Sequence, residues 1–185
     1  RHPAALRSFP NRCTPADRCA PTNGHMTMST IEQRLQVLED IEEIRKLKAR
    51  YCAACDDAHN PETLGPLFAD DAVWEATSLG RAEGREAIKA LLGGLGRSGT
   101  IRNSGHHAIN PIIDVDGDRA TGHWRLIMLY TGYRSDRSLQ YRRIIGWYRE
   151  QYVRIAGRWH FQHLYCQVEE HAPYVLETDG VNATK

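Results

Sequence analysis

Cys52 and Cys55 have the Cys-x-x-Cys spacing used by thiol–disulfide exchange enzymes and by zinc sites. On a helix, residues three apart share one face, so two such thiols lie close to each other. A zinc site of this kind needs a second pair of ligands at similar spacing, and the sequence contains none. The pair also falls within a helical pattern. We therefore interpret both side chains as core packing rather than as a redox or metal site.

Composition excludes several classes of protein. The cysteines are odd in number and irregularly spaced, which favours free thiols in a cytoplasmic, reducing compartment: they are Cys13, Cys19, Cys52, Cys55 and Cys166. Lys and Arg number 24 and Asp and Glu number 23, and residues 1–25 hold four of the arginines, so the body is slightly acidic. A nucleic-acid partner would require a basic face. No run of 18 apolar residues occurs, so we expect no membrane span.

The first 28 residues differ from the rest of the chain. Residues 1–25 contain four prolines and lack both an apolar period and the hydrophobic region of a signal peptide. Their arginines would also suit a transit peptide, but we interpret residues 1–28 as a disordered leader, with a natural start at Met26 or Met28. Residues 29–172 then form one domain, and residues 173–185 form a loose C-terminal tail.

A long amphipathic helix is predicted to begin after Ser29, because Ser29-Thr30-Ile31-Glu32 has the composition of a capping box. Apolar residues then recur at steps of three and four: Ile31, Leu35, Leu38, Ile41, Ile44, Leu47, Tyr51 and Ala54. Asn60-Pro61 suits the N-cap and first position of a new short helix, so the long helix should end between Asp56 and His59. A third helix is predicted over residues 85–95.

After this third helix the apolar period changes to two residues, which indicates strands. Strands are predicted over residues 72–76, 105–115, 119–131, 142–155 and 158–169, with a turn region at 80–84 and a polar loop at 132–140. Asp116-Gly117 and Ala156-Gly157 are expected to turn the chain between long strands. An antiparallel sheet of this size has one face that the helices must cover.

These elements predict an α+β fold, in which a curved antiparallel sheet forms a cone around the long N-terminal helix. A cone open at one end suits a small-molecule cavity. On the strand at 119–131, alternate residues should line that cavity: Trp124, Leu126, Met128 and Tyr130. His106 and His107 are adjacent on a strand and therefore point to opposite faces, so one of them should enter the cavity.

Three stretches resemble the SnoaL-like branch of the nuclear transport factor 2-like fold: the helix at 41–57, LFADDAVWE at 67–75 and HHAINPIIDVDGDRATG at 106–122. The segment 146–159 fits as well, and the similarity covers roughly residues 30–170. It implies the cystatin-like α+β barrel described above. It does not imply one activity, because this fold hosts dehydratases, isomerases, cyclases, hydrolases and non-catalytic binders.

Within this superfamily the sequence is most similar to scytalone dehydratase and bile-acid 7-alpha dehydratase, with lindane dehydrochlorinase as a more distant relative. The resemblance implies an Asp–His pair at Asp56 and His106, with neither a metal nor an organic cofactor. It also matches Tyr51 to a helical tyrosine of the bile-acid enzyme and Trp74 to a pocket tryptophan of the dehydrochlorinase. A register shift of one residue would give the role of base to His107 instead.

Elimination beside an activated C–H bond needs a base for the proton and assistance to the leaving group. A neutral histidine suits the first task because its ordinary pKa is about 6.5, and a carboxylate on its second nitrogen fixes the tautomer. Tyr51 could polarise a substrate oxygen. Tyr51 and Asp56 are five residues apart, about 140° around an ideal helix, so both reach one site only if the helix ends near Asp56. Each of these residues also has a plain structural interpretation, Asp56 as a solvent-facing residue and Tyr51 and Trp74 as core.

The sequence departs from the resembled enzymes at accessory positions. Met128 stands where the bile-acid dehydratase has a pocket aspartate, and Gln167 lies near the position of its C-terminal arginine. A ketosteroid isomerase would need a carboxylate at Ala76. These departures prevent transfer of a substrate and disfavour the isomerase.

The leading hypothesis is a cofactor-independent lyase of the dehydratase type that acts on a small, largely apolar hydroxylated ring compound. His106 would be the base, Asp56 its orienting group and Tyr51 the polariser. The side chains expected to contact substrate are Trp74, His107, Trp124, Met128 and Tyr130. The alternatives are a non-catalytic binding domain and a small-subunit partner of a ring-hydroxylating oxygenase. Fold analogy, together with the apolar start of the long helix, also predicts a homodimer or higher homo-oligomer.

Overall fold

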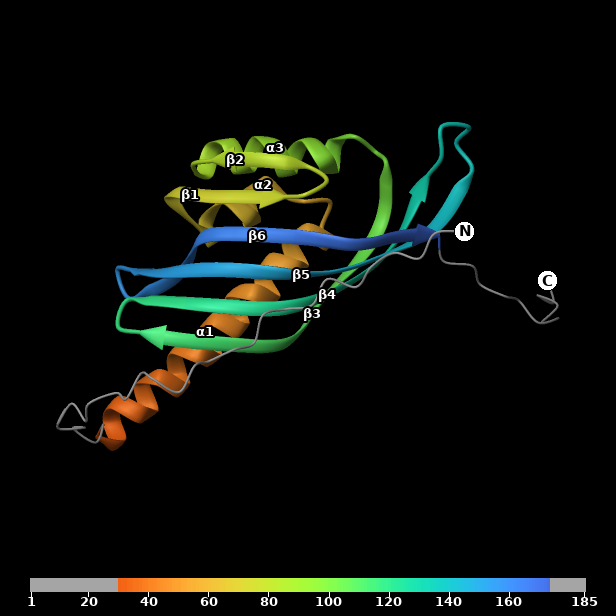
Figure 1. The fold of residues 1–185 in the computed structure, drawn as a ribbon. Coiled ribbons are helices and arrows are strands. Elements are labelled where there is room, and N and C mark those ends of the chain that lie inside the picture. The colour runs from red at the N-terminus through yellow and green to blue at the C-terminus, as the bar shows by residue number, and fades with distance from the viewer. Residues whose placement is uncertain (1–29, 174–185) are drawn as a thin grey trace, which may run out of the picture. The chain divides into compact units, whose positions relative to one another are not determined.

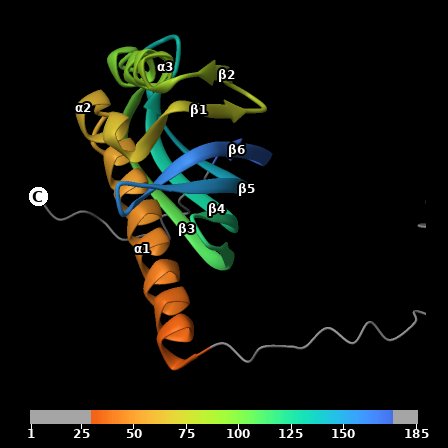
Figure 2. The ribbon, with the colours of Figure 1, turned by 90° about the vertical axis from the view of Figure 1, so that its left-hand side faces the viewer.

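The long amphipathic helix is α1, Ile31–Asp56, in a computed structural model that describes residues 30–173. The predicted leader, the capping residue Ser29, and the tail from residue 174 onward lie outside the described residues. The second half of α1 buries the predicted apolar face, from Ile44 to Cys55. α1 crosses one face of the sheet, and its first turns extend beyond the strands (Figures 1 and 2).

The predicted helix stripe is therefore only half buried. Ile31, Leu35 and Leu38 keep 77%, 53% and 64% of their surface exposed. They belong to the first part of α1, which extends beyond the strands (Figure 1). The partner helix expected to cover these residues stays a prediction.

The chain reverses directly after Asp56, the last residue of α1. Ala58 and His59 both adopt left-handed backbone angles, with φ of 51° and 52°. Asn60 then caps α2 (Pro61–Leu64), because its side-chain oxygen accepts from the Glu62 N–H at 3.1 Å. A short 3-10 helix, η1, follows over Gly65–Leu67. The predicted end of the long helix and the Asn-Pro start of the next are confirmed.

The first hairpin contains a strand that the sequence reading missed. β1 (Phe68–Ala76) pairs antiparallel with β2 (Gly80–Glu83), and Trp74 lies opposite the buried Ala82. The predicted turn region at 80–84 is therefore wrong, because the turn lies at residues 77–79. Two glycines within five residues gave the segment the composition of a turn, whereas pairing with β1 makes it a short edge strand.

Helix α3 (Arg85–Arg97) extends two residues past its predicted end. Gly96 explains its glycine-rich last turn, since a Cβ at that position would collide with the backbone carbonyl of Ala58. This close approach holds the end of α3 against the left-handed turn that carries His59.

Four long strands complete the sheet: β3 (Ile101–Asp116), β4 (Arg119–Tyr133), β5 (Leu139–Ile155) and β6 (Arg158–Pro173). The strand order is β2-β1-β6-β5-β4-β3, and all neighbours are antiparallel except β1 and β6. Bulges interrupt the register of β3, near Asn110, and of the β5–β6 pair. Such bulges bend strands and curve the sheet around the helices. The predicted α+β class and curved antiparallel sheet are confirmed.

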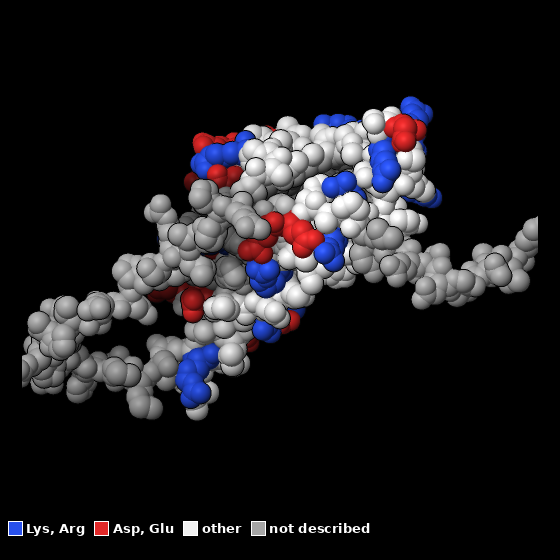
Figure 3. Space-filling model, turned by 45° about the vertical axis from the view of Figure 1, so that its right-hand side comes forward, with Lys and Arg blue, Asp and Glu red and all other residues white. Residues whose placement is uncertain are grey.

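The core lies between the concave face of the sheet and the helices. Its centre consists of apolar side chains that are at most 1% exposed: Leu64, Phe68, Ile88, Leu92, Phe161 and Leu164. Each such side chain contributes about 1.5–3 kcal/mol through burial. None of the helices in residues 30–173 combines the length and apolar character that crossing a bilayer requires. On the face shown in Figure 3, acidic and basic side chains are interspersed rather than gathered by sign.

Candidate active site

A cavity of about 340 Å³ lies between the end of α1, α3 and the concave side of the sheet. Most of its wall is apolar, with Leu92, Leu95, Leu126, Ile144 and Val168 among the lining residues. Its polar lining groups come from distant parts of the chain and include Tyr51, Cys55, His59, His106, Tyr130 and His171. An apolar cavity with a few converging polar groups is the usual form of a small-molecule site.

Asp56 and His106 form a close pair at the edge of this cavity. The His106 Nδ1 and Asp56 Oδ1 atoms are 2.6 Å apart. The same carboxylate accepts from the His106 backbone N–H at 2.9 Å and from the Ser104 hydroxyl at 2.7 Å. The end of α1 is thus fixed to β3 at the residues that the resemblance singled out. His106 lines the cavity, and Asp56 lies behind it.

Hydrogen bonding keeps the Asp56 carboxylate ionised. Burial alone would raise the pKa of Asp56, but the donors from His106 and Ser104 lower it below its ordinary value. An ionised Asp56 accepts the proton of Nδ1, which leaves Nε2 of His106 as the nitrogen with a free lone pair. This is the tautomer that a general base requires.

His59 is a cavity residue that the sequence reading did not find. The residue is 8% exposed, and its ring lies edge-on to that of His106, with the ring centroids 6.1 Å apart. Burial, and then the neighbouring His106, lower the pKa of His59 to about 4, so this ring is neutral at physiological pH. Position 59 follows a helical cavity residue, Cys55, by one turn, and that spacing is the signal that could have identified it.

Tyr51 lies deeper in the cavity. Its hydroxyl accepts a hydrogen bond from Trp74 Nε1 at 3.0 Å, and its ring contacts Phe161 edge-on at 5.5 Å. Burial raises the pKa of Tyr51 well above its ordinary value, so the phenol stays protonated and can donate. Both Tyr51 and Trp74 line the cavity, as expected.

Two of the residues expected to contact substrate lie elsewhere. Met128 and Tyr130 line the cavity, but Trp124 does not, and its indole N–H instead donates to the Tyr152 hydroxyl at 3.0 Å. Trp124 lies further along β4, beyond the lining residues Leu126, Met128 and Tyr130. His107 is exposed on the other side of β3, where strand alternation places it once His106 points inward.

His171 at the cavity mouth was also missed, because the last strand was predicted to end at residue 169. Its Nε2 atom lies 2.7 Å from the Tyr130 hydroxyl and accepts from Arg142 Nε at 2.9 Å. Burial and the nearby Arg142 lower the pKa of His171. The mouth of the cavity is therefore polar, whereas its interior is mainly apolar.

The two helical cysteines lie on neighbouring parts of one face of α1 but line different hollows. Cys55 is buried and lines the cavity, whereas Cys52 lies in the groove behind Asp56. Both are free thiols, as is Cys166, and burial raises the pKa of all three. The Cys-x-x-Cys spacing does not place the two thiols at one site, in keeping with the packing interpretation.

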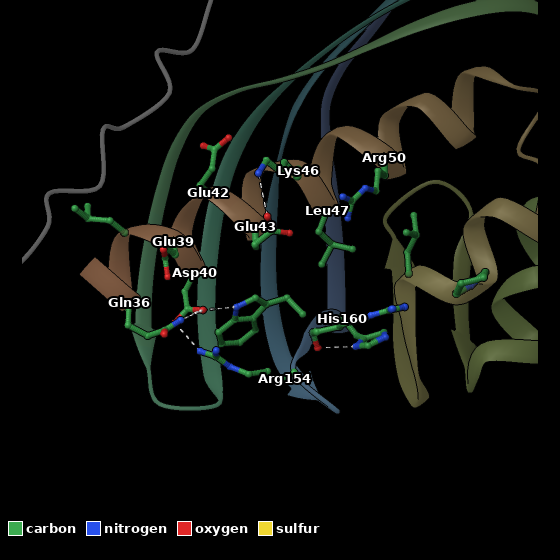
Figure 4. A pocket seen from close by; sticks show the side chains of 16 residues that line it. Gln36, Glu39, Asp40, Glu42, Glu43, Lys46, Leu47, Arg50, Arg154 and His160 are labelled. Carbon is green, nitrogen blue, oxygen red and sulfur yellow. Dashed lines mark hydrogen bonds and ion pairs between the residues drawn. The ribbon is translucent and has the colours of Figure 1, made fainter. Parts of the chain in front are cut away.

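A larger hollow of about 970 Å³ lies between the first half of α1 and the β5–β6 turn (Figure 4). Its lining charges are solvent-exposed: Glu39, Glu42, Glu43, Lys46 and Arg50. The buried acid of its wall, Asp40, accepts from Trp159 Nε1 at 3.0 Å and from Arg154 Nη2 at 2.5 Å. That carboxylate is committed to joining α1 to β5 and β6. We therefore place the candidate active site in the smaller cavity.

Comparison with known proteins agrees with this fold. A sequence profile described as a SnoaL-like domain matches residues 36–165. A crystal structure from Novosphingobium aromaticivorans, provisionally assigned as a scytalone dehydratase, is 25% identical with a TM-score of 0.67 over 77% of this chain and 93% of its own. A cystatin-like protein of the nuclear transport factor 2 type from the same organism is also 25% identical, with a TM-score of 0.61 over 77% and 92% of the two chains.

A type 2 hexachlorocyclohexane dehydrochlorinase shares the fold at 20% identity, with a TM-score of 0.69 over 80% of this chain and 99% of its own. Comparison with curated proteins gives no significant match.

Proposed function

The chain belongs to the SnoaL-like domain family, and from that premise we propose that it is a cofactor-independent lyase that eliminates water or a comparable leaving group from a small ring compound. The observation that carries the proposal is the 2.6 Å contact between Asp56 and His106, with His106 facing the cavity. A non-catalytic binding domain would not need this pair within hydrogen-bond distance.

In this mechanism His106 Nε2 takes a proton from a carbon adjacent to the one that bears the leaving group. The C–H electrons form the new double bond, and the leaving hydroxide or halide departs with the electrons of its own bond. Asp56 stabilises the resulting imidazolium, which can return its proton to a departing hydroxide as water. Tyr51 donates a hydrogen bond to the substrate oxygen where negative charge develops.

The cavity supports a small, mainly apolar substrate. Its volume of about 340 Å³ is at the lower end for ligand sites, and its interior wall is rich in Leu, Ile and Val. Two similar structures are named for eliminations, one as a dehydratase and one as a dehydrochlorinase of a chlorinated ring. The fold is shared with these proteins, and the loss of water or halide from a ring is the reaction we extend to this chain.

The test follows release of water or halide from a panel of cyclic β-hydroxy carbonyl compounds and chlorinated cyclohexanes. We expect His106→Gln to lower the rate of the best substrate by about 10²–10⁴-fold, the usual contribution of a general base. His107→Gln is the matched control, since it alters the adjacent residue on the opposite face of β3. A His106→Gln protein with the full rate would rule the mechanism out.

A further inference from the structure

We propose that Cys55, His59 and His106 form a binding site for one soft divalent cation, and that zinc is the ion this donor set favours. One ligand atom from each residue lies within 4.8 Å of the other two. All three side chains line the same cavity, which gives an ion a route of entry. The site uses only the second cysteine of the Cys-x-x-Cys motif, because Cys52 lines the groove behind Asp56 instead.

The three donors match zinc better than magnesium or calcium. One thiolate and two imidazoles are soft or borderline ligands, and three protein ligands with a fourth position open to a cavity are typical of zinc. The neighbouring carboxylate, Asp56, is occupied by His106 and Ser104. A hard cation would therefore find no free oxygen ligand among these residues.

The orientation of His106 also suits coordination. Its Nδ1 atom is held by Asp56 at 2.6 Å, so Nε2 is the nitrogen available to an ion. A carboxylate that accepts from the second nitrogen of a metal-bound histidine is the common outer-shell arrangement, and it fixes the ring and strengthens the ligand. Asp56 already occupies that position.

His59 supplies an independent observation. His59 lines the cavity and is 8% exposed as a residue, and no group in residues 30–173 hydrogen-bonds to its ring. Its ring nitrogens are accessible from the cavity and are therefore free to coordinate an ion. The left-handed turn at Ala58 and His59 holds this ring next to Cys55 and His106 at a cost of about 1–3 kcal/mol per strained residue.

Binding requires a small adjustment and the release of one proton. Zinc–nitrogen and zinc–sulfur distances of about 2.0–2.3 Å place tetrahedral ligand atoms about 3.5 Å apart. Side-chain rotations at Cys55 and His59 would close the difference from the present separation. The Cys55 thiol loses its proton to solvent as it coordinates, while both imidazoles bind as neutral bases.

A bound ion would use the lone pair that His106 needs in order to accept a proton. Occupation by zinc and base catalysis would therefore exclude each other, and the ion would act as an inhibitor rather than as a cofactor. This consequence rests on the proposed function. The binding site itself does not, so binding is measured without any substrate.

The experiment uses the full-length chain without an affinity tag, freed of metal by a chelator. The background is Cys13→Ser/Cys19→Ser, so that cysteines outside the described residues give no signal. Titration with Co²⁺ should give one site with thiolate-to-cobalt absorption in the near ultraviolet, and Zn²⁺ should displace the cobalt. Cys55→Ser, His59→Gln and His106→Gln should each weaken Zn²⁺ binding at least tenfold, and Cys55→Ser should abolish the thiolate band.

Two neighbouring substitutions serve as controls. Cys52→Ser alters a thiol that lines a different hollow, and His107→Gln alters the histidine on the opposite face of β3. Each should change the affinity less than twofold. The proposal is overturned if the starting protein shows no thiolate band with Co²⁺, or if the controls weaken binding as much as the site variants. If a site variant fails to fold, absence of the band in the starting protein still overturns the proposal.

Discussion

At the scale of single residues, Asp56 shows how one carboxylate can select a tautomer. Its oxygens accept from the ring and backbone of His106 and from Ser104, and these donors outweigh the effect of burial on its pKa. Nε2 of His106 is left free only while Asp56 is an acceptor. The main role of the Asp56 carboxylate in the proposed mechanism is therefore to fix the tautomer of His106.

Asp56→Asn should lower kcat by about 10²–10⁴-fold with little change in KM, because the amide can donate to Nδ1 and move the imidazole proton to Nε2. Steady-state kinetics on the best elimination substrate checks this expectation. Ser104→Ala removes a weaker donor from the same carboxylate and should cost far less. Equal effects of the two substitutions would contradict the role assigned to Asp56.

His59 predicts a pH dependence of stability. Its folded-state pKa of about 4 lies below the ordinary 6.5, so between these values the unfolded chain binds more protons than the folded chain. The stability from the neutral ring is complete above pH 6.5 and is lost as the pH falls toward 4. From pH 7 to pH 5 the free energy of unfolding should fall by about 2 kcal/mol from this group.

Urea unfolding of His59→Asn and of the starting protein at the two pH values measures this contribution. The variant should lose less stability than the starting protein between pH 7 and pH 5. His107→Gln, which replaces an exposed histidine on β3, is the matched control. An identical loss in His59→Asn would show that another group is responsible.

At the scale of elements, the site depends on how α1 ends and on what packs against that end. Gly96 of α3 lies so close to Ala58 that a methyl group would collide with the carbonyl oxygen there. The left-handed turn, His59 and the end of α3 thus form one packed unit. A substitution at this contact in α3 should therefore displace the turn that holds His59 in the cavity.

Gly96→Ala should therefore destabilise the protein by about 1–3 kcal/mol, the usual cost of overpacking, despite the better helix propensity of alanine. Gly94→Ala is a matched control in the same helix, because nothing lies within 4 Å of its added Cβ. That substitution should stabilise by up to about 1 kcal/mol. Urea unfolding of both variants tests the pair, and a stable Gly96→Ala protein would contradict this packing.

At the scale of the whole folded unit, a buried ion pair joins α1 to the sheet. Lys48 Nζ lies 2.5 Å from Glu150 on β5, and both side chains are at most 1% exposed. The Tyr152 hydroxyl donates to the same carboxylate, and the Lys48 ammonium lies 3.2 Å from the centre of the Tyr148 ring. Groups 102 residues apart in the chain are thus matched in the interior.

Lys48→Met should cost about 3–5 kcal/mol of unfolding free energy, because it leaves the buried Glu150 without an opposite charge. The double variant Lys48→Met/Glu150→Gln should recover at least half of that loss, since the neutral amide can still accept from Tyr152. Lys46→Met removes an exposed pair with Glu43 and should change stability by less than about 1 kcal/mol. A double variant as unstable as Lys48→Met would contradict this account.

The sequence by itself determined the features that depend on local periods. The apolar residues at steps of three and four predicted α1, and Asn60-Pro61 predicted where it ends. The alternation of side chains along a strand showed that only one of His106 and His107 could face inward. The family resemblance singled out Asp56 and His106, and the structure brings the two together. Local backbone geometry repeats with a fixed period, so these features can be read along the chain.

Only the tertiary structure decided which side chains share the cavity. β2 exists because β1 pairs with it, His171 reaches the mouth because β6 extends to Pro173, and Trp124 is excluded because β4 runs past the cavity. His59 joins His106 through a left-handed turn that α3 supports. These outcomes depend on strand pairing and on packing between distant segments, and the period of one segment carries no information about either.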